Sequence, residues 1–306
     1  MDRADSTSHV TLADAGMETY LIYRESINLP AFASFTALDH APGRAALTRY
    51  YQAIIDVAVR DRRRLILDSA TWRASSDWGK LLGYSDAGID EANASAVALV
   101  ADLKSAAGPD VDIVVGGCVG PRGDGYAASS GLTQSEAADY HLPQISSLAT
   151  AGAQFITAMT LGDPNEAAGI LSAARECAMP AVISFTIETT GRLASGAQVA
   201  TAIAETDRLT DGYATHYLLN CAHPIHMQRA LDSPAPEMQR IKGMRVNASM
   251  QSHAELDAAT KLDDGDPADL ARRCADLLVA YPLFSVIGGC CGTDGRHISA
   301  MSAALG

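Results

Sequence analysis

Residues 284–293 read Phe-Ser-Val-Ile-Gly-Gly-Cys-Cys-Gly-Thr, so a short apolar run ends in two adjacent cysteines flanked by glycines. A short, nearly continuous apolar run is typical of a strand that is buried on both faces of a parallel sheet. In a (β/α)8 barrel, catalytic groups lie at the C-terminal ends of such strands. The position of the two cysteines therefore favours a barrel in which they take part in chemistry.

The same kind of unit recurs along the whole chain. Eight apolar runs are predicted to be strands, at 9–13, 64–68, 111–118, 154–160, 180–187, 215–221, 244–248 and 284–289. Segments of helical composition lie at 44–59, 89–107, 135–151, 165–178, 198–211, 267–281 and 295–303. Eight evenly spaced units predict that 1–306 is a single α/β domain, a (β/α)8 TIM barrel, rather than a doubly wound open sheet. The stretch 16–43 is predicted to be a loop that covers the substrate.

Charge and hydropathy narrow the classes of partner. The formal net charge is -13, from 36 acidic and 23 basic side chains, which disfavours nucleic acid as a partner. No apolar stretch approaches the roughly 20 residues that cross a bilayer, so no membrane association is expected. The first residues lack the pattern of a signal peptide, which predicts a cytoplasmic protein. Assembly as a homo-oligomer is left open.

Three cysteines stand where barrel strands end. Cys221 closes the sixth predicted strand, while Cys290 and Cys291 follow the eighth. Three thiolates from two strands can hold Zn²⁺ and leave its fourth tetrahedral position open, as in a catalytic site. The alternatives are buried core cysteines or, for the adjacent pair, a vicinal disulfide, which would not explain Cys221. The remaining cysteines are interpreted as structural: Cys118, Cys177 and Cys274.

With these motifs the sequence resembles the homocysteine S-methyltransferase family, which includes betaine- and S-methylmethionine-homocysteine methyltransferases. Asn220-Cys221 and Gly288-Gly-Cys-Cys-Gly-Thr293 are similar to the two zinc-binding motifs of the family. Weaker support comes from Asp14-Ala-Gly-Met, Gly120-Pro121 and Ser184-Phe185-Thr186.

The resemblance implies a catalytic Zn²⁺ site made by Cys221, Cys290 and Cys291. It implies a thiol acceptor such as homocysteine and a small onium methyl donor, S-methylmethionine, a betaine-like compound or S-adenosylmethionine. Coordination to zinc favours the thiolate, which attacks the methyl carbon. The candidate substrate-binding residues are Asp14, Trp72, Met159, Asn220 and Asn247. Trp72 follows the second predicted strand, where its ring suits a cationic donor, and Phe32 and Phe35 are further aromatic candidates.

Two departures from the family concern the ammonium group of the acceptor. After the fourth strand, a Glu-Thr pair of the family is replaced by Met159-Thr160. Near the first strand, Thr-Glu-Leu becomes Thr19-Tyr20-Leu21. Losing a buried carboxylate beside an ammonium weakens recognition by about 2–5 kcal/mol. The acceptor is therefore expected to differ from homocysteine or to be bound without strong ammonium recognition, unless Asp14 and Glu188 or an ordered water compensate.

Other functions remain compatible with the sequence. A zinc hydrolase or lyase would use the open metal position for water, and a ligand-sensing protein would retain the metal site without catalysis. Three thiolates favour thiolate chemistry over activation of water. The sequence leaves the roles of three residues open: His141, His223 and Glu188.

Overall fold

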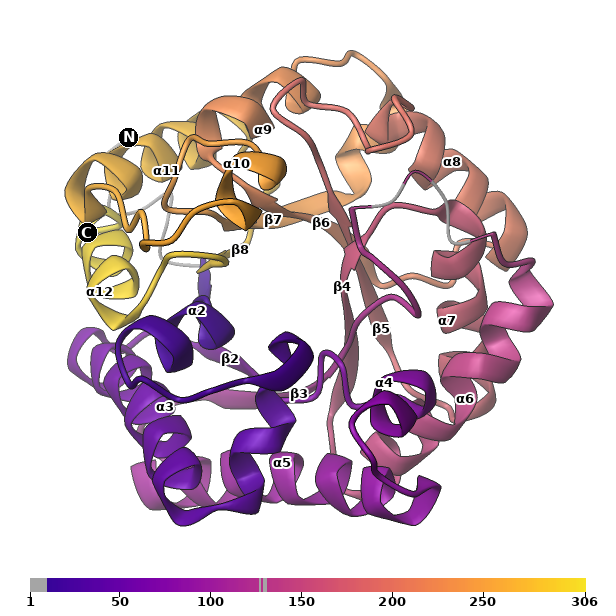
Figure 1. Ribbon diagram of the computed structural model, residues 1–306. Helices are drawn as coiled ribbons and strands as arrows, with labels where there is room; N and C mark the ends of the chain where they lie inside the picture. The colour runs from indigo at the N-terminus through magenta and orange to yellow at the C-terminus, as the bar shows by residue number, and fades with distance from the viewer. Residues whose placement is uncertain (1–9, 127, 129–130) are drawn as a thin grey trace.

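The computed structural model describes residues 10–126, 128 and 131–306, and within them eight parallel strands close into one barrel. Each strand pairs with the next in sequence, and β8 closes the ring on β1 (Figure 1). The TIM barrel prediction is therefore confirmed. The strands are β1 Thr11–Ala13, β2 Leu65–Asp68, β3 Ile113–Val119, β4 Phe155–Leu161, β5 Ala181–Thr186, β6 His216–Ala222, β7 Ile241–Val246 and β8 Val286–Gly289.

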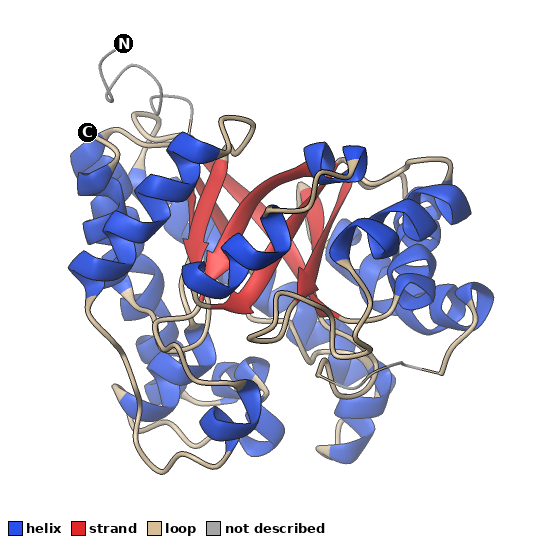
Figure 2. Cartoon of the chain, turned by 90° about the horizontal axis from the view of Figure 1, so that it is seen from above, coloured by secondary structure: helices blue, strands red, loops and turns tan. Residues whose placement is uncertain are grey.

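Helices surround the barrel, as the view in Figure 2 shows. Seven of them match the predicted segments: α3 Ala41–Asp61, α5 Asp86–Ala107, α6 Gln134–Thr150, α7 Pro164–Glu176, α8 Val199–Thr210, α11 Pro267–Ala280 and α12 Gly295–Ala304. Four short helices were not predicted: α2 Met17–Tyr23, α4 Ser76–Leu81, α9 Pro224–Leu231 and α10 His253–Asp257. Of the helices described, none combines the length and apolar character needed to cross a bilayer.

Two details of the prediction were wrong. The stretch 16–43 is largely helical, since it contains α2 and the 3-10 helices η1 Pro30–Phe32 and η2 Ser34–Asp39. Helices of two turns or less are too short to produce a readable apolar period. The strand predicted at 244–248 begins earlier, because Lys242 interrupts the apolar run although it belongs to β7.

The interior of the barrel changes character along its axis. One inward-facing layer is apolar and consists of Ala13, Val182, Leu218 and Val286. Nearer the C-terminal ends of the strands, the buried side chains are polar or charged: Asp14, Asp68, Thr157, Ser184, Asn220 and Arg245. The candidate site lies at this end.

Candidate active site

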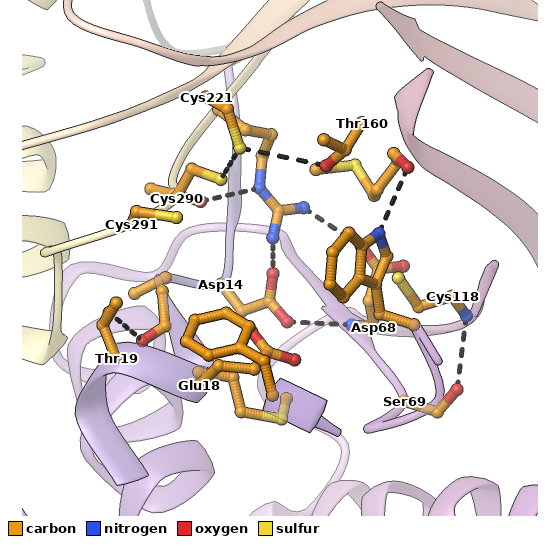
Figure 3. Close-up of a pocket in the computed structure, with 18 of the residues that line it drawn as sticks. Asp14, Glu18, Thr19, Asp68, Ser69, Cys118, Thr160, Cys221, Cys290 and Cys291 are labelled. Carbon is orange, nitrogen blue, oxygen red and sulfur yellow. Dashed lines mark hydrogen bonds and ion pairs between the residues drawn. The ribbon is translucent and has the colours of Figure 1, made fainter. Parts of the chain in front are cut away.

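The three cysteines predicted to converge do so. Cys221 lies in β6, and Cys290 and Cys291 directly follow β8. Their Sγ atoms all lie within 4.8 Å of one another, with 2.7 Å between Cys221 and Cys290 (Figure 3). Zn–S bonds of about 2.3 Å at tetrahedral angles place sulfurs roughly 3.8 Å apart, so the group fits zinc after small side-chain shifts. All three thiols are free, and the pair forms no vicinal disulfide.

A strained backbone conformation at Cys221 directs its side chain toward Cys290 and Cys291. Its φ is 55°, and the β6–β7 register shifts between Asn220 and Ala222. Its carbonyl oxygen accepts hydrogen bonds from Asn247 Nδ2 at 3.0 Å and His253 Nε2 at 2.6 Å. A bulge redirects a side chain, and positive φ in a non-glycine residue persists only where neighbours hold it. The β-bulge therefore places the Cys221 sulfur at the barrel mouth.

A matching irregularity lies on β4. Thr160 has a φ of 65°, and the β4–β5 register shifts between Ala158 and Leu161. The Thr160 hydroxyl lies 3.8 Å from Cys221 Sγ and 2.9 Å from the side-chain amide of Asn220. Two bulged strands thus support the same sulfur.

The loop after β8 fixes the other two thiols. Cys290 N–H donates to the Val246 carbonyl at 2.7 Å, and Thr293 Oγ1 donates to the Cys290 carbonyl at 2.7 Å. Gly292 has a φ of 81°, a conformation that L side chains rarely adopt. The glycine after the pair, noted in the sequence, therefore permits the turn.

The thiols share their protons unequally. Hydrogen bonds with Cys290 and Cys291 hold the pKa of Cys221 well below its usual value, against the effect of burial. The pKa of Cys290 is raised to about 12, chiefly because its thiol is hydrogen-bonded to Cys221. The pKa of Cys291 is raised well above its usual value by the same two neighbours. The first proton is therefore lost most readily from Cys221, and a divalent cation would favour loss of all three protons.

The triad borders a cavity of about 80 Å³ at the barrel mouth. Its other lining side chains include Asp14, Glu18, Phe32, Asp68, Trp72, Tyr126, Met159 and Arg245. A second cavity of about 110 Å³ adjoins it and shares Thr19, Phe32, Tyr126 and Cys291 with the first. Cys291 therefore lines both cavities, whereas Cys221 and Cys290 line only the first.

A buried ionic network forms one side of the first cavity. The Arg245 guanidinium pairs with Asp14 and, at 3.1 Å, with Asp68. Asp68 also accepts from Thr157 Oγ1 at 2.8 Å. A Cβ on Gly288 would lie 2.9 Å from the Arg245 side chain, so this glycine leaves room for the arginine. Burial lowers the pKa of Arg245 to about 10, which leaves it charged at neutral pH.

The predicted substrate-binding residues are divided between several positions. Asp14, Trp72 and Met159 line the first cavity, and Trp72 Nε1 donates to the Met159 carbonyl at 3.2 Å. Asn247 lines the second. Asn220 is fully buried and lines neither of them; its amide is held between the hydroxyls of Ser184 and Thr160. Asn220 therefore lies outside both cavities, and its hydrogen bonds hold the part of β6 that carries Cys221.

Of the two aromatic alternatives, Phe32 lines both cavities, whereas Phe35 is fully buried against Tyr84. Phe35 therefore belongs to the packing of the outer helices.

Sequence reasoning missed several lining residues, among them Glu18, Asp68, Tyr126 and Arg245. Tyr20, expected to replace a site carboxylate, donates its hydroxyl proton to Glu25 at 2.7 Å and does not line the cavity. Glu18, two positions earlier, lines it instead. An acidic residue so close to the altered position was the available signal.

The structure also shows the contacts of the three residues whose roles the sequence left open, His141, His223 and Glu188. His141 contacts Glu166 at 3.0 Å, and His223 caps the N-terminus of α9. Glu188 contacts His253 Nδ1 at 3.1 Å, and through that ring it is linked to the Cys221 carbonyl. Glu188 is therefore connected to the cysteine cluster through His253.

Comparison with known proteins gives consistent matches. The family model described as "Homocysteine S-methyltransferase" matches residues 11–305. A curated relative, methionine synthase of Mycobacterium leprae (strain TN), is 29% identical over 128 residues, covering 42% of this chain and 10% of that protein. The match therefore spans about a tenth of the relative's length.

Solved structures of the homocysteine methyltransferase MmuM from Escherichia coli share the fold. The metallated form has a TM-score of 0.72 at 20% identity, covering 96% of each chain. The oxidized form has a TM-score of 0.74 at 19% identity, covering 99% of each chain.

Proposed function

The chain belongs to the homocysteine S-methyltransferase family, and on this premise we propose that it transfers a methyl group from a small onium donor to the thiol of homocysteine. The observation that carries the proposal is the convergence of Cys221, Cys290 and Cys291 on one point beside an acidic cavity. The donor set consists of three thiols and suits zinc. When bound, zinc would supply Lewis acidity that favours the thiolate form of the acceptor.

The residues around the triad would hold and align the two substrates. Three carboxylates, Asp14, Glu18 and Asp68, face one guanidinium, Arg245, in the cavity wall. This excess of negative charge favours a cationic donor. The acceptor sulfur would use its electron pair to form the new C–S bond while the bond from the methyl carbon to the onium atom breaks. The donor then leaves as a neutral thioether or amine, so alignment is the main task of the protein.

A panel assay tests the proposal. Zinc-loaded protein is incubated with homocysteine or other thiols and with S-methylmethionine, betaine or S-adenosylmethionine, and mass spectrometry detects methyl thioethers. Methionine formed with one of these donors supports the proposal. Hydrolysis or elimination of a substrate without methyl transfer would favour the zinc hydrolase or lyase, and binding without turnover would favour a sensing role.

Trp72 provides the first mutational prediction. Its ring lines the cavity, and the Arg73 guanidinium lies 4.7 Å from the ring centroid. Trp72→Ala should raise the KM for the onium donor about tenfold, because a desolvated cation–π contact contributes about 1–2 kcal/mol. The KM for the thiol should change much less. Steady-state kinetics with each substrate varied at saturation of the other measures both values.

Trp78 offers a matched control for this prediction. Its ring stacks on Arg73 at 4.0 Å but is not part of the cavity wall. Trp78→Ala should therefore leave the donor KM near its native value. Equal effects of the two variants on donor and thiol would assign Trp72 to packing.

A further inference from the structure

Glu18 is one of the three carboxylates that line the first cavity. It lies in the first turn of α2, and its side chain reaches the cavity wall next to Asp14 (Figure 3). Its Oε1 accepts a hydrogen bond from Ser34 Oγ at 2.8 Å. A negative charge on Cys290 would raise the pKa of Glu18, although less than burial does. One carboxylate therefore stands within electrostatic range of the sulfur cluster.

Glu18 differs from Asp14 and Asp68 in that no cationic side chain is paired with it among the described residues. Asp14 and Asp68 both pair with Arg245 and are buried. Within the described residues, Glu18 forms no ion pair, and burial raises its pKa. Because the first two carboxylates already share a guanidinium, Glu18 is the acid whose charge a bound cation would compensate most.

Arg73 is a cation that acts on the charge of Glu18, but its guanidinium is bound to other groups. Arg73 lowers the pKa of Glu18 through space, but less than burial raises it. The Arg73 guanidinium donates to the Ala31 carbonyl and is stacked between the rings of Trp72 and Trp78. It is held by these contacts instead of by an ion pair with Glu18.

We propose that Glu18 binds the α-ammonium group of the acceptor amino acid and so determines acceptor specificity. This inference rests on the proposed function. An ammonium group has N–H donors that a carboxylate oxygen can accept, whereas the sulfonium or quaternary ammonium centre that carries the transferred methyl group has none. Met159, in the same wall, is apolar and cannot neutralise the charge. The acceptor would thus place its sulfur at the triad and its ammonium at α2.

This assignment changes the expectation drawn from the sequence. The departures at Tyr20 and Met159 suggested that an ammonium would be poorly recognised. Tyr20 turns toward Glu25, outside the cavity, and Glu18 supplies a carboxylate from the neighbouring turn. Homocysteine is therefore compatible with the cavity although both family positions have changed.

The decisive probe is 4-mercaptobutyrate, which is homocysteine without its amino group. In zinc-loaded protein with saturating donor, Glu18→Gln should raise the KM for homocysteine by roughly 30-fold or more, because the ammonium group of bound homocysteine loses its charged partner. The KM for 4-mercaptobutyrate should stay within about twofold, and kcat should change little for either thiol. Glu91→Gln, an identical change on the exposed face of α5, is the matched control and should alter neither KM.

Each outcome decides the inference. An equal rise in KM for both thiols, a rise confined to the methyl donor, or native protein that uses the two thiols equally well would overturn it. If native protein methylates homocysteine and Glu18→Gln does so unchanged, the inference fails while the proposed function stands. If native protein methylates no thiol, the proposed function fails first. Should Glu18→Gln not fold, as judged by thermal melting, Glu18→Asp must retain part of the preference for homocysteine.

Discussion

Replacing Cys290 with alanine should reduce zinc from about one ion per chain to nearly none, because a site with three protein ligands loses one of them. Even the loss of an outer hydrogen-bond partner lowers metal affinity about 10- to 100-fold, so loss of a direct ligand should cost more. Methyl transfer should fall in parallel. Metal analysis after dialysis against a chelator measures the first effect, and the methyl thioether assay measures the second.

Cys118 gives the matched control for zinc retention. It is a free cysteine that lines the same cavity but lies outside the triad. Cys118→Ala should keep a full complement of zinc, while Cys221→Ala and Cys291→Ala should behave like the Cys290 variant. Full zinc content in all three triad variants would show that the metal lies elsewhere.

Replacing Arg245 with methionine should lower the free energy of unfolding by about 3–5 kcal/mol, because two buried carboxylates lose their partner. Burial already raises the pKa of Asp68, and the guanidinium 3.1 Å away favours its charged form. Without the Arg245 charge, the folded-state pKa of Asp68 rises further above the pKa of an aspartate in the unfolded chain. The stability deficit should therefore be small at pH 4 and grow as the pH rises through the folded-state pKa. Urea unfolding at several pH values measures it.

Two further variants separate charge from packing at Arg245. Adding Asp14→Asn and Asp68→Asn to Arg245→Met should recover much of the lost stability, because the carboxylates are then neutral. Arg272 forms an ion pair with Asp269 on the surface, and Arg272→Met should cost less than about 1 kcal/mol. A pH-independent deficit in Arg245→Met would attribute the loss to packing alone.

The sequence was sufficient for the barrel and for the metal ligands because both depend on local patterns. Apolar runs alternate with helical segments, and strand-end residues of a parallel barrel must meet at one mouth. Cys221 and Cys290 could therefore be brought together without coordinates. The β-bulge at Cys221 could not be foreseen, because it depends on how β6 pairs with β7.

Glu18 and Arg245 could not be placed from the sequence for a different reason. Glu18 faces the cavity only because α2 forms, and that helix of seven residues is too short for periodicity to predict. Arg245 lies in a β-strand, where a charged residue ordinarily indicates exposure. Its partners are far away in the sequence: Asp14 directly follows β1, and Asp68 ends β2.

The position of Arg245 has a consequence for substrate traffic. Arg245 borders the mouth cavity and also a separate cavity at the opposite end of the barrel, which Arg64 and Phe155 help to line. The ion pairs of Arg245 with Asp14 and Asp68 lie between the two cavities and separate them. Both substrates are therefore expected to enter on the mouth side of this ionic network.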